Sequence, residues 1–106
     1  MLSSVERFGE ATVVKVPGTR LDASIAEGFK DSVRELIQAG ERRIIVDFST
    51  IEFMDSSGLG ALVGAMKIMG TGGTIEIAAP NEAVMKVLRL TRMNKVFTIH
   101  EAMPVH

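Results

Sequence analysis

The stretch Phe-Met-Asp-Ser-Ser-Gly-Leu-Gly, residues 53–60, joins two apolar regions through small polar residues and glycines. On its carboxyl side, apolar residues recur every three or four positions, as they do on one face of an α-helix. These residues are Leu59, Leu62, Val63, Met66 and Met69. Aspartate and serine accept hydrogen bonds from the unpaired N–H groups at a helix start. The stretch therefore predicts a strand-to-helix junction, with a helix that begins near Ser56 and ends at Gly70.

Short runs rich in β-branched residues lie on both sides of this junction and are typical of strands. The predicted strands are residues 5–8, 11–16, 43–48, 74–79 and 96–100. The first two surround Gly9-Glu10 and predict a hairpin. The third reads Arg-Ile-Ile-Val-Asp-Phe, an almost continuous apolar run that is expected in a buried central strand.

Two more helices are predicted from the apolar spacing of the remaining segments. Residues 24–39 follow the helical period, with Ser24 and Glu27 as a capping box and Gly40 as the stop. Asp22 is an alternative cap of this helix. Pro80-Asn81 introduces the last helix, whose apolar positions again recur at helical intervals.

The predicted order is β-β-α-β-α-β-α-β, which implies right-handed crossovers between parallel strands. We therefore predict an α/β fold, with a mixed, mostly parallel sheet of four or five strands packed with about three helices. At 106 residues the chain has the size of one domain, and we assign residues 1–106 to it.

Composition excludes several classes of function. The chain has 12 basic and 13 acidic residues, a net charge of −1 and no block of like charges, which argues against nucleic-acid binding. It has no cysteine, which fits a reducing compartment, so we expect a cytoplasmic protein. Residues 59–69 are too few to cross a bilayer and include Lys67, so we expect no membrane insertion.

Enzymatic functions of residues 53–60 are disfavoured by the residues that surround the serines. A nucleophile elbow requires Gly-x-Ser-x-Gly, whereas Met54 and Asp55 stand two positions before the two serines. Histidines occur only at positions 100 and 106, and no phosphate-binding glycine motif or metal-ligand spacing is present. We therefore predict no enzyme activity, no cofactor and no metal. On the residues alone, helix capping by Asp55, Ser56 or Ser57 is favoured.

The helix that follows is apolar nearly all round, and Lys67 is its only charged residue. Its face near Gly60, Val63, Gly64 and Lys67 is either a docking patch for a partner helix or a surface enclosed by neighbouring elements. The sequence leaves both interpretations open.

Residues 55–60, Asp-Ser-Ser-Gly-Leu-Gly, resemble the signature of the STAS domain of bacterial anti-sigma factor antagonists. Leu21-Asp22 before the first helix and Gly72-Gly73 before the fourth strand agree with that family as well. The resemblance covers about residues 5–100. It implies that Ser56 is phosphorylated, with Ser57 as the less favoured acceptor.

The resemblance also implies the partners. The unphosphorylated protein, a monomer when free, would capture an anti-sigma factor that is also a serine kinase, and so release a sigma factor. The kinase would supply ATP and magnesium, phosphorylation would end binding, and a PP2C-type phosphatase would reset the serine. Family members also occur as unphosphorylated subunits of lipid-transport ATPase complexes, which is the alternative function.

The implied partner-binding surface combines the serine motif with the helix that follows. Its residues are Asp22, Asp55, Ser56, Ser57, Gly58, Leu59, Gly60, Val63, Gly64 and Lys67. Two departures from the family pattern are visible. Residues 18–22 are slightly longer than is usual before the first helix, and the chain given stops at His106, so the final helix of the family is expected to be absent or short.

Overall fold

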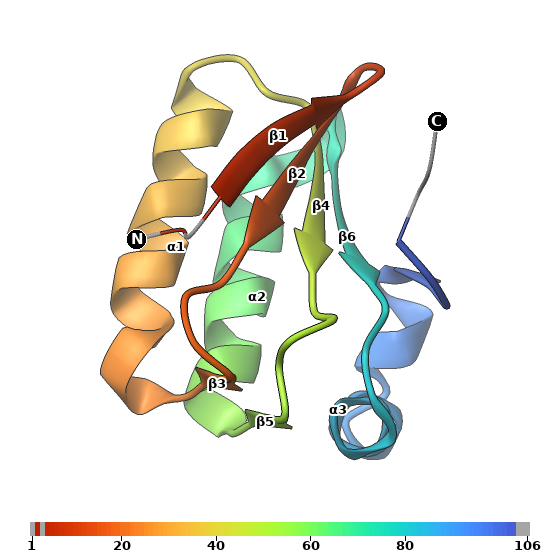
Figure 1. Ribbon diagram of the computed structural model, residues 1–106. Coiled ribbons are helices and arrows are strands. Elements are labelled where there is room, and N and C mark those ends of the chain that lie inside the picture. The colour runs from red at the N-terminus through yellow and green to blue at the C-terminus, as the bar shows by residue number, and fades with distance from the viewer. Residues whose placement is uncertain (1, 3, 104–106) are drawn as a thin grey trace.

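Five strands form a mixed sheet in the order β1-β2-β4-β6-β7 (Figure 1). They are β1 (Ser4–Phe8), β2 (Ala11–Lys15), β4 (Arg43–Asp47), β6 (Thr74–Ala78) and β7 (Thr98–His100). The structure is a computed structural model that describes residue 2 and residues 4–103. β1 and β2 are antiparallel, and every other neighbouring pair is parallel. The predicted α/β class and mostly parallel sheet are confirmed.

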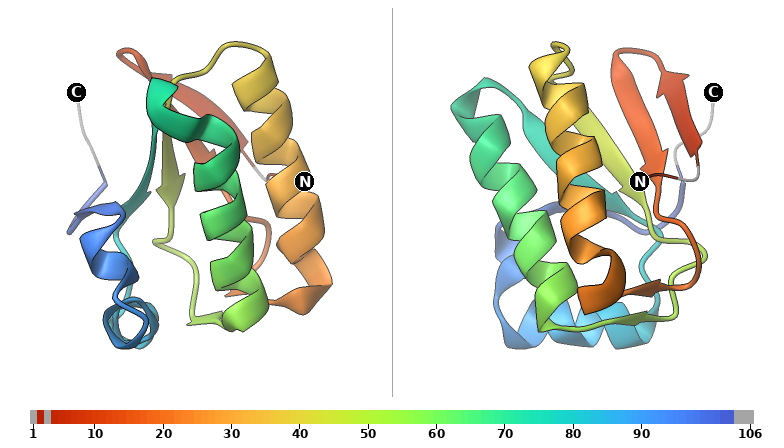
Figure 2. Two further views of the ribbon diagram at one scale, coloured as in Figure 1. Left: turned by 180° about the vertical axis from the view of Figure 1, so that it is seen from behind. Right: turned by 90° about the vertical axis from the view of Figure 1, so that its left-hand side faces the viewer.

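Three α-helices connect the strands. They are α1 (Ala23–Gln38), α2 (Ser56–Met69) and α3 (Glu82–Leu90), with short 3-10 turns at Gly70–Gly72 and Met93–Lys95. α1 and α2 lie side by side over one face of the sheet, whereas α3 lies at the end of the sheet, where β4 and β6 finish (Figures 1 and 2).

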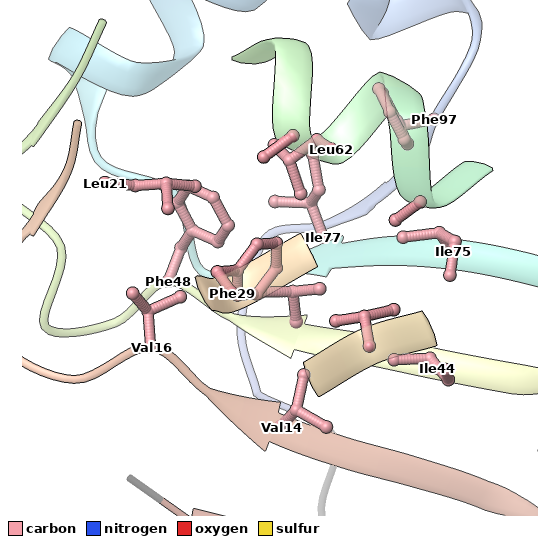
Figure 3. Packing of buried hydrophobic residues seen from close by; sticks show 14 of the residues in the cluster. Val14, Val16, Leu21, Phe29, Ile44, Phe48, Leu62, Ile75, Ile77 and Phe97 are labelled. Carbon is pink, nitrogen blue, oxygen red and sulfur yellow. The ribbon is translucent and has the colours of Figure 1, made fainter. Parts of the chain in front are cut away.

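The main core lies between the sheet and the pair α1 and α2 (Figure 3). Side chains alternate along a strand, so Ile44 and Val46 of β4 join this core, whereas Ile45 joins a small cluster on the other face. Phe29 from α1 and Leu62 from α2 are fully buried among them. The continuous apolar run of β4 is thus explained by burial on both faces.

The sheet face turned away from α1 and α2 holds a buried polar cluster around Glu76. Its carboxylate accepts hydrogen bonds from Arg43 Nε at 2.9 Å, Thr74 Oγ1 at 2.7 Å and His100 Nε2 at 2.7 Å. Burial raises the pKa of Glu76, but the hydrogen bonds from Arg43, Thr74 and His100 outweigh it, and the pKa falls to about 2. His100, one of the two histidines of the chain, is thus engaged with Glu76.

Two short strands escape prediction from the sequence. β3 (Arg20–Leu21) and β5 (Phe53–Met54) pair in parallel as a separate two-stranded sheet. Leu21 and Met54 point into the core, while Arg20 and Phe53 are exposed. This small sheet leads the chain directly into the starts of α1 and α2.

The predicted capping box of Ser24 and Glu27 is wrong, whereas the alternative cap of the first helix, Asp22, is confirmed. α1 begins at Ala23, and Asp22 is its N-cap. Ser24 donates its backbone N–H and its hydroxyl to Asp22 Oδ1, at 3.0 and 2.6 Å, instead of accepting a bond itself. Glu27 is exposed and pairs with Lys30 at 3.5 Å. Both Asp22 and Ser24 are good capping residues, and the extended backbone at Asp22 decides between them.

The last strand is shorter than predicted. Residues 93–95 form a 3-10 turn, and the N–H groups of Val96 and Phe97 donate to the Met93 carbonyl, so β7 starts only at Thr98. Residues 101–103 form no helix, and residues 104–106, where the final helix of the family was considered, lie outside the described residues. Among the helices described, none is long and apolar enough to cross a membrane.

Candidate functional site at the start of α2

Asp55 caps α2 from an extended backbone conformation with a φ of −101°. Its Oδ1 accepts the Gly58 N–H at 2.9 Å, and its carbonyl accepts the Leu59 N–H at 3.0 Å. The sequence allowed Asp55, Ser56 or Ser57 as the cap, and the structure assigns that role to Asp55. The two serines are consequently the first two residues of the helix itself.

Gly58 is required by the close approach of β3. A Cβ atom at this position would lie 2.1 Å from the carbonyl oxygen of Leu21 and 2.8 Å from its Cγ. The same carbonyl accepts the Asp55 N–H at 3.3 Å, so the backbone of β3 is hydrogen-bonded to the residue that caps α2. Gly58 is buried and Leu59 is half-buried against the core. Gly58 and Leu59 therefore position the start of α2 through their contacts with β3 and with the core.

Ser56 and Ser57 are both exposed at the mouth of the helix. Neither hydroxyl makes a hydrogen bond within the part of the chain that the structure describes. Both belong to the first turn, whose free N–H groups make this the positive end of the helix dipole. The site thus presents two unengaged hydroxyls where an added negative charge is electrostatically favoured by the helix.

Asp22 is the N-cap of α1, and the starts of α1 and α2 lie at the same end of the molecule (Figure 1). Besides Ser24, it accepts a hydrogen bond from Arg20 Nε at 3.2 Å. The hydrogen bonds from Ser24 and then Arg20 lower the pKa of Asp22 below its usual value. Asp22 is therefore a structural cap with an ionised carboxylate.

A pocket of about 290 Å³ opens between the first halves of α1 and α2. Its walls are small residues with one ion pair at the rim: Ala23, Ala26, Glu27, Lys30, Ser57, Gly60 and Ala61. Ser57 borders this pocket, whereas Ser56 does not line it. The structure therefore brings the start of α1 and the serine motif together around one concave surface.

The second half of the predicted docking patch is partly covered by α1. A Cβ at Gly64 would lie 2.9 Å from Lys30 Cδ, so this glycine faces α1 rather than solvent. Val63 is half-buried and packs against the core, while Gly60 and Lys67 are exposed. The enclosed interpretation therefore holds for Val63 and Gly64, whereas Gly60 and Lys67 remain open to solvent.

Arg20 and Phe53 form an exposed pair that the sequence did not single out. The parallel register of β3 and β5 sets them side by side, and the Arg20 guanidinium lies 4.3 Å from the centre of the Phe53 ring. Phe53 remains 39% exposed. Strands of two residues are too short to show an alternating pattern, so no signal in the sequence could have placed this pair.

The STAS domain family model matches residues 3–104. The chain belongs to the STAS domain family. A candidate anti-sigma factor antagonist of Thermotoga maritima is 33% identical over 91 residues, which cover 84% of this chain and 80% of the relative. The resemblance inferred from residues 55–60 is thereby confirmed.

Solved structures agree with this assignment at the level of the fold. A crystal structure of a candidate anti-sigma factor antagonist from Thermotoga maritima superimposes with a TM-score of 0.87 at 26% identity, covering 94% of this chain and 86% of that one. The Bacillus cell fate determinant SpoIIAA in its phosphorylated form gives a TM-score of 0.69 at 24% identity, over 91% and 88% of the two chains. The STAS fold of the present chain follows from both.

Proposed function

We propose that this chain is an anti-sigma factor antagonist in a partner-switching pathway of the bacterial cytoplasm. In its unphosphorylated form it binds an anti-sigma factor that is also a serine kinase, and phosphorylation of Ser56 ends that binding. The observation that carries the proposal is the division of roles at the start of α2, where Asp55 caps the helix and Ser56 stays exposed and unengaged. The names of its STAS relatives support the same class of partner.

A phosphate on Ser56 is compatible with the fold. Ser56 is the first residue of α2, and an anion there gains about 0.3–1 kcal/mol from the helix dipole. The hydroxyl has no hydrogen bond to lose among the described residues. The same fold exists in a phosphorylated form in SpoIIAA. Phosphorylation is therefore expected to leave the domain folded.

The loss of binding then arises in the interface. A serine kinase must bring the γ-phosphate of ATP and a carboxylate base up to the Ser56 hydroxyl, so Ser56 lies inside the interface with the kinase. In the transfer, Ser56 Oγ bonds to the γ-phosphorus, the bond to the bridging oxygen breaks, ADP leaves, and the serine proton passes to the base. The new phosphate, beside Asp55, then faces like charges. Burying a poorly paired anion costs several kcal/mol, which corresponds to at least about a hundredfold in affinity.

Ser57 is the less favoured acceptor because of where it lies. It borders the pocket between α1 and α2, close to Ala61 and the Glu27–Lys30 pair. A phosphate there would have to fit into a pocket already lined by the Glu27–Lys30 ion pair, whereas Ser56 lies outside that pocket. The kinase supplies ATP and magnesium, so this chain needs no cofactor of its own, and a PP2C-type phosphatase hydrolyses the phosphoserine to reset the switch.

The test uses the purified chain with each anti-sigma-type serine kinase encoded in the same genome. We expect the wild type and Ser57→Ala to gain one phosphoryl group each, and Ser56→Ala to gain none while it still binds the kinase. The phosphorylated protein and Ser56→Asp should bind at least about a hundredfold more weakly. Phosphate on another residue, or tight binding by the phosphorylated form, would contradict the proposal. Stable binding to a transporter ATPase without phosphorylation would instead support the alternative function.

A further inference from the structure

The carboxyl-terminal part of the chain has a strong local excess of positive charge. Residues 83–100 contain no acidic residue. Their basic residues are Lys86, Arg89, Arg92 and Lys95. The rest of the sequence holds all 13 acidic residues and only eight of the 12 basic ones, so the net charge of −1 conceals two regions of opposite sign.

All four basic residues belong to α3 or to the turn after it. α3 buries Val84 and Leu88, and the helical period places Lys86, Arg89 and Leu90 on the opposite side. All three are exposed, and so are Arg92 and Lys95, which follow the helix. We call these five residues the α3 outer surface. Figure 2 shows α3 at the margin of the molecule, outside the layer formed by α1 and α2.

Most of the basic side chains on the α3 outer surface lack an acidic partner. Arg89 pairs with Glu82 at the start of the helix. The other three basic residues make no ion pair with any described part of the chain. Arg92 stands in the left-handed conformation with a φ of 61° and ends the helix. Among the described residues, acidic side chains therefore neutralise only part of the positive charge of this surface.

Leu90 gives the surface a second property. It is 75% exposed, the most exposed large hydrophobic residue described. The helical period places it on the same side of α3 as Lys86 and Arg89. A leucine on a solvent-facing helix side contributes nothing to the core, which Val84 and Leu88 already fill. Cations around one protruding apolar side chain match a bilayer interface, where anionic headgroups lie directly above hydrocarbon.

We propose that the α3 outer surface binds anionic lipid membranes peripherally and reversibly, with the cations at the headgroups and Leu90 at the boundary of the hydrocarbon. Nucleic acid offers phosphates but no apolar medium for Leu90. A single nine-residue helix is also small for a stable protein interface, which needs about 1,000 Å² or more. The acidic remainder of the chain is repelled by the same membrane, so α3 faces it. This inference is independent of the proposed switch at Ser56.

The experiment is flotation of the full chain with vesicles of equal parts phosphatidylglycerol and phosphatidylcholine, compared with phosphatidylcholine alone. We expect binding to the anionic vesicles only, and weakening as added salt screens the charges. Each cation near an anionic bilayer contributes about a factor of five, so Lys86→Glu with Lys95→Glu should lower partitioning at least tenfold. Leu90→Ser should lower it severalfold and leave the salt dependence in place.

Matched variants control for net charge and for exposed apolar area. Lys30→Glu with Arg34→Glu makes the same charge change on α1, and Val5→Ser removes another exposed apolar side chain. Both should partition nearly as the wild type does, and circular dichroism checks that every variant is folded. The inference is overturned if anionic vesicles do not float the protein, if the α1 variant loses as much binding as the α3 variant, or if Leu90→Ser changes nothing. Binding to a DNA duplex without binding to vesicles would likewise overturn it.

Discussion

Replacing Gly58 by alanine tests how the serine motif is held in place. The added methyl group would stand 2.1 Å from the Leu21 carbonyl oxygen and 2.9 Å from the carbonyl carbon. Both are backbone atoms of a strand, so no side-chain rotation relieves the clash. Either β3 moves away or the first turn of α2 shifts, and in both cases the hydrogen bond from Asp55 N to Leu21 O is disturbed.

The magnitude follows from three contributions. Overpacking in a close contact costs about 1–3 kcal/mol, and the disturbed hydrogen bond about 1 kcal/mol. Alanine in place of glycine within a helix returns about 1 kcal/mol. Gly58→Ala should therefore destabilise the domain by about 1–3 kcal/mol. Gly60→Ala, two residues later, has nothing within 4 Å of its new Cβ and should stabilise by up to about 1 kcal/mol.

Urea unfolding of both variants and the wild type measures the difference. The gain in helix propensity is common to the two variants, so the gap between them, about 2–4 kcal/mol, isolates the clash with β3. Equal slopes of the unfolding curves are needed for the comparison. A gap below about 0.5 kcal/mol, the range of neutral surface substitutions, would refute the conclusion that β3 fixes the start of α2.

Three further predictions concern single side chains. Asp55→Ala should cost about 1 kcal/mol in urea unfolding through the lost cap, while Asp55→Asn keeps the acceptor and should cost little. Gly64→Ala should be tolerated without loss of stability, because the nearest atom, Lys30 Cδ, belongs to a flexible side chain; marked destabilisation would show that α1 and α2 cannot yield there. The pKa of Glu76 is lowered to about 2 in the folded state, so its contribution, on the order of 3 kcal/mol, should be present above about pH 4.5 and lost as the pH falls toward 2. Glu76→Gln should remove that part of the pH dependence, and an unchanged acid limb in the variant would assign it to other carboxylates.

The larger elements could be predicted because their patterns are long. The β-branched run of residues 43–48 and the helical period of residues 24–39 leave little choice of secondary structure. Shorter features had no such pattern. β3 and β5 contain two residues each, and their pairing depends on where the longer elements place them. The cap of α1 depends on a backbone angle at Asp22 that no residue type fixes.

The serine motif is enough to locate the site in the sequence. The tertiary structure is needed to explain why glycine stands at positions 58 and 64. The glycines after the serines suggest close packing, but only the structure shows that the neighbour at Gly58 is the Leu21 backbone. For Gly64 the sequence leaves open whether its face is a docking patch or enclosed, and the structure places Lys30 of α1 against it. In both cases the deciding neighbour is distant in sequence, so local propensity contains no information about it.

The assignment of the cap to Asp55 determines how variants of the serine motif can be interpreted. Because Ser56 supplies no hydrogen bond to the helix among the described residues, neither variant should lose stability. Removing the hydroxyl should leave binding intact, whereas charging it should weaken binding. A binding defect in Ser56→Asp can then be attributed to the interface. Asp55→Ala cannot be read that way, since it also removes the cap. Asp55→Asn retains the Gly58 acceptor and deletes one negative charge. Comparing phosphorylated Ser56 beside aspartate and beside asparagine therefore separates repulsion between like charges from the cost of desolvating the phosphate.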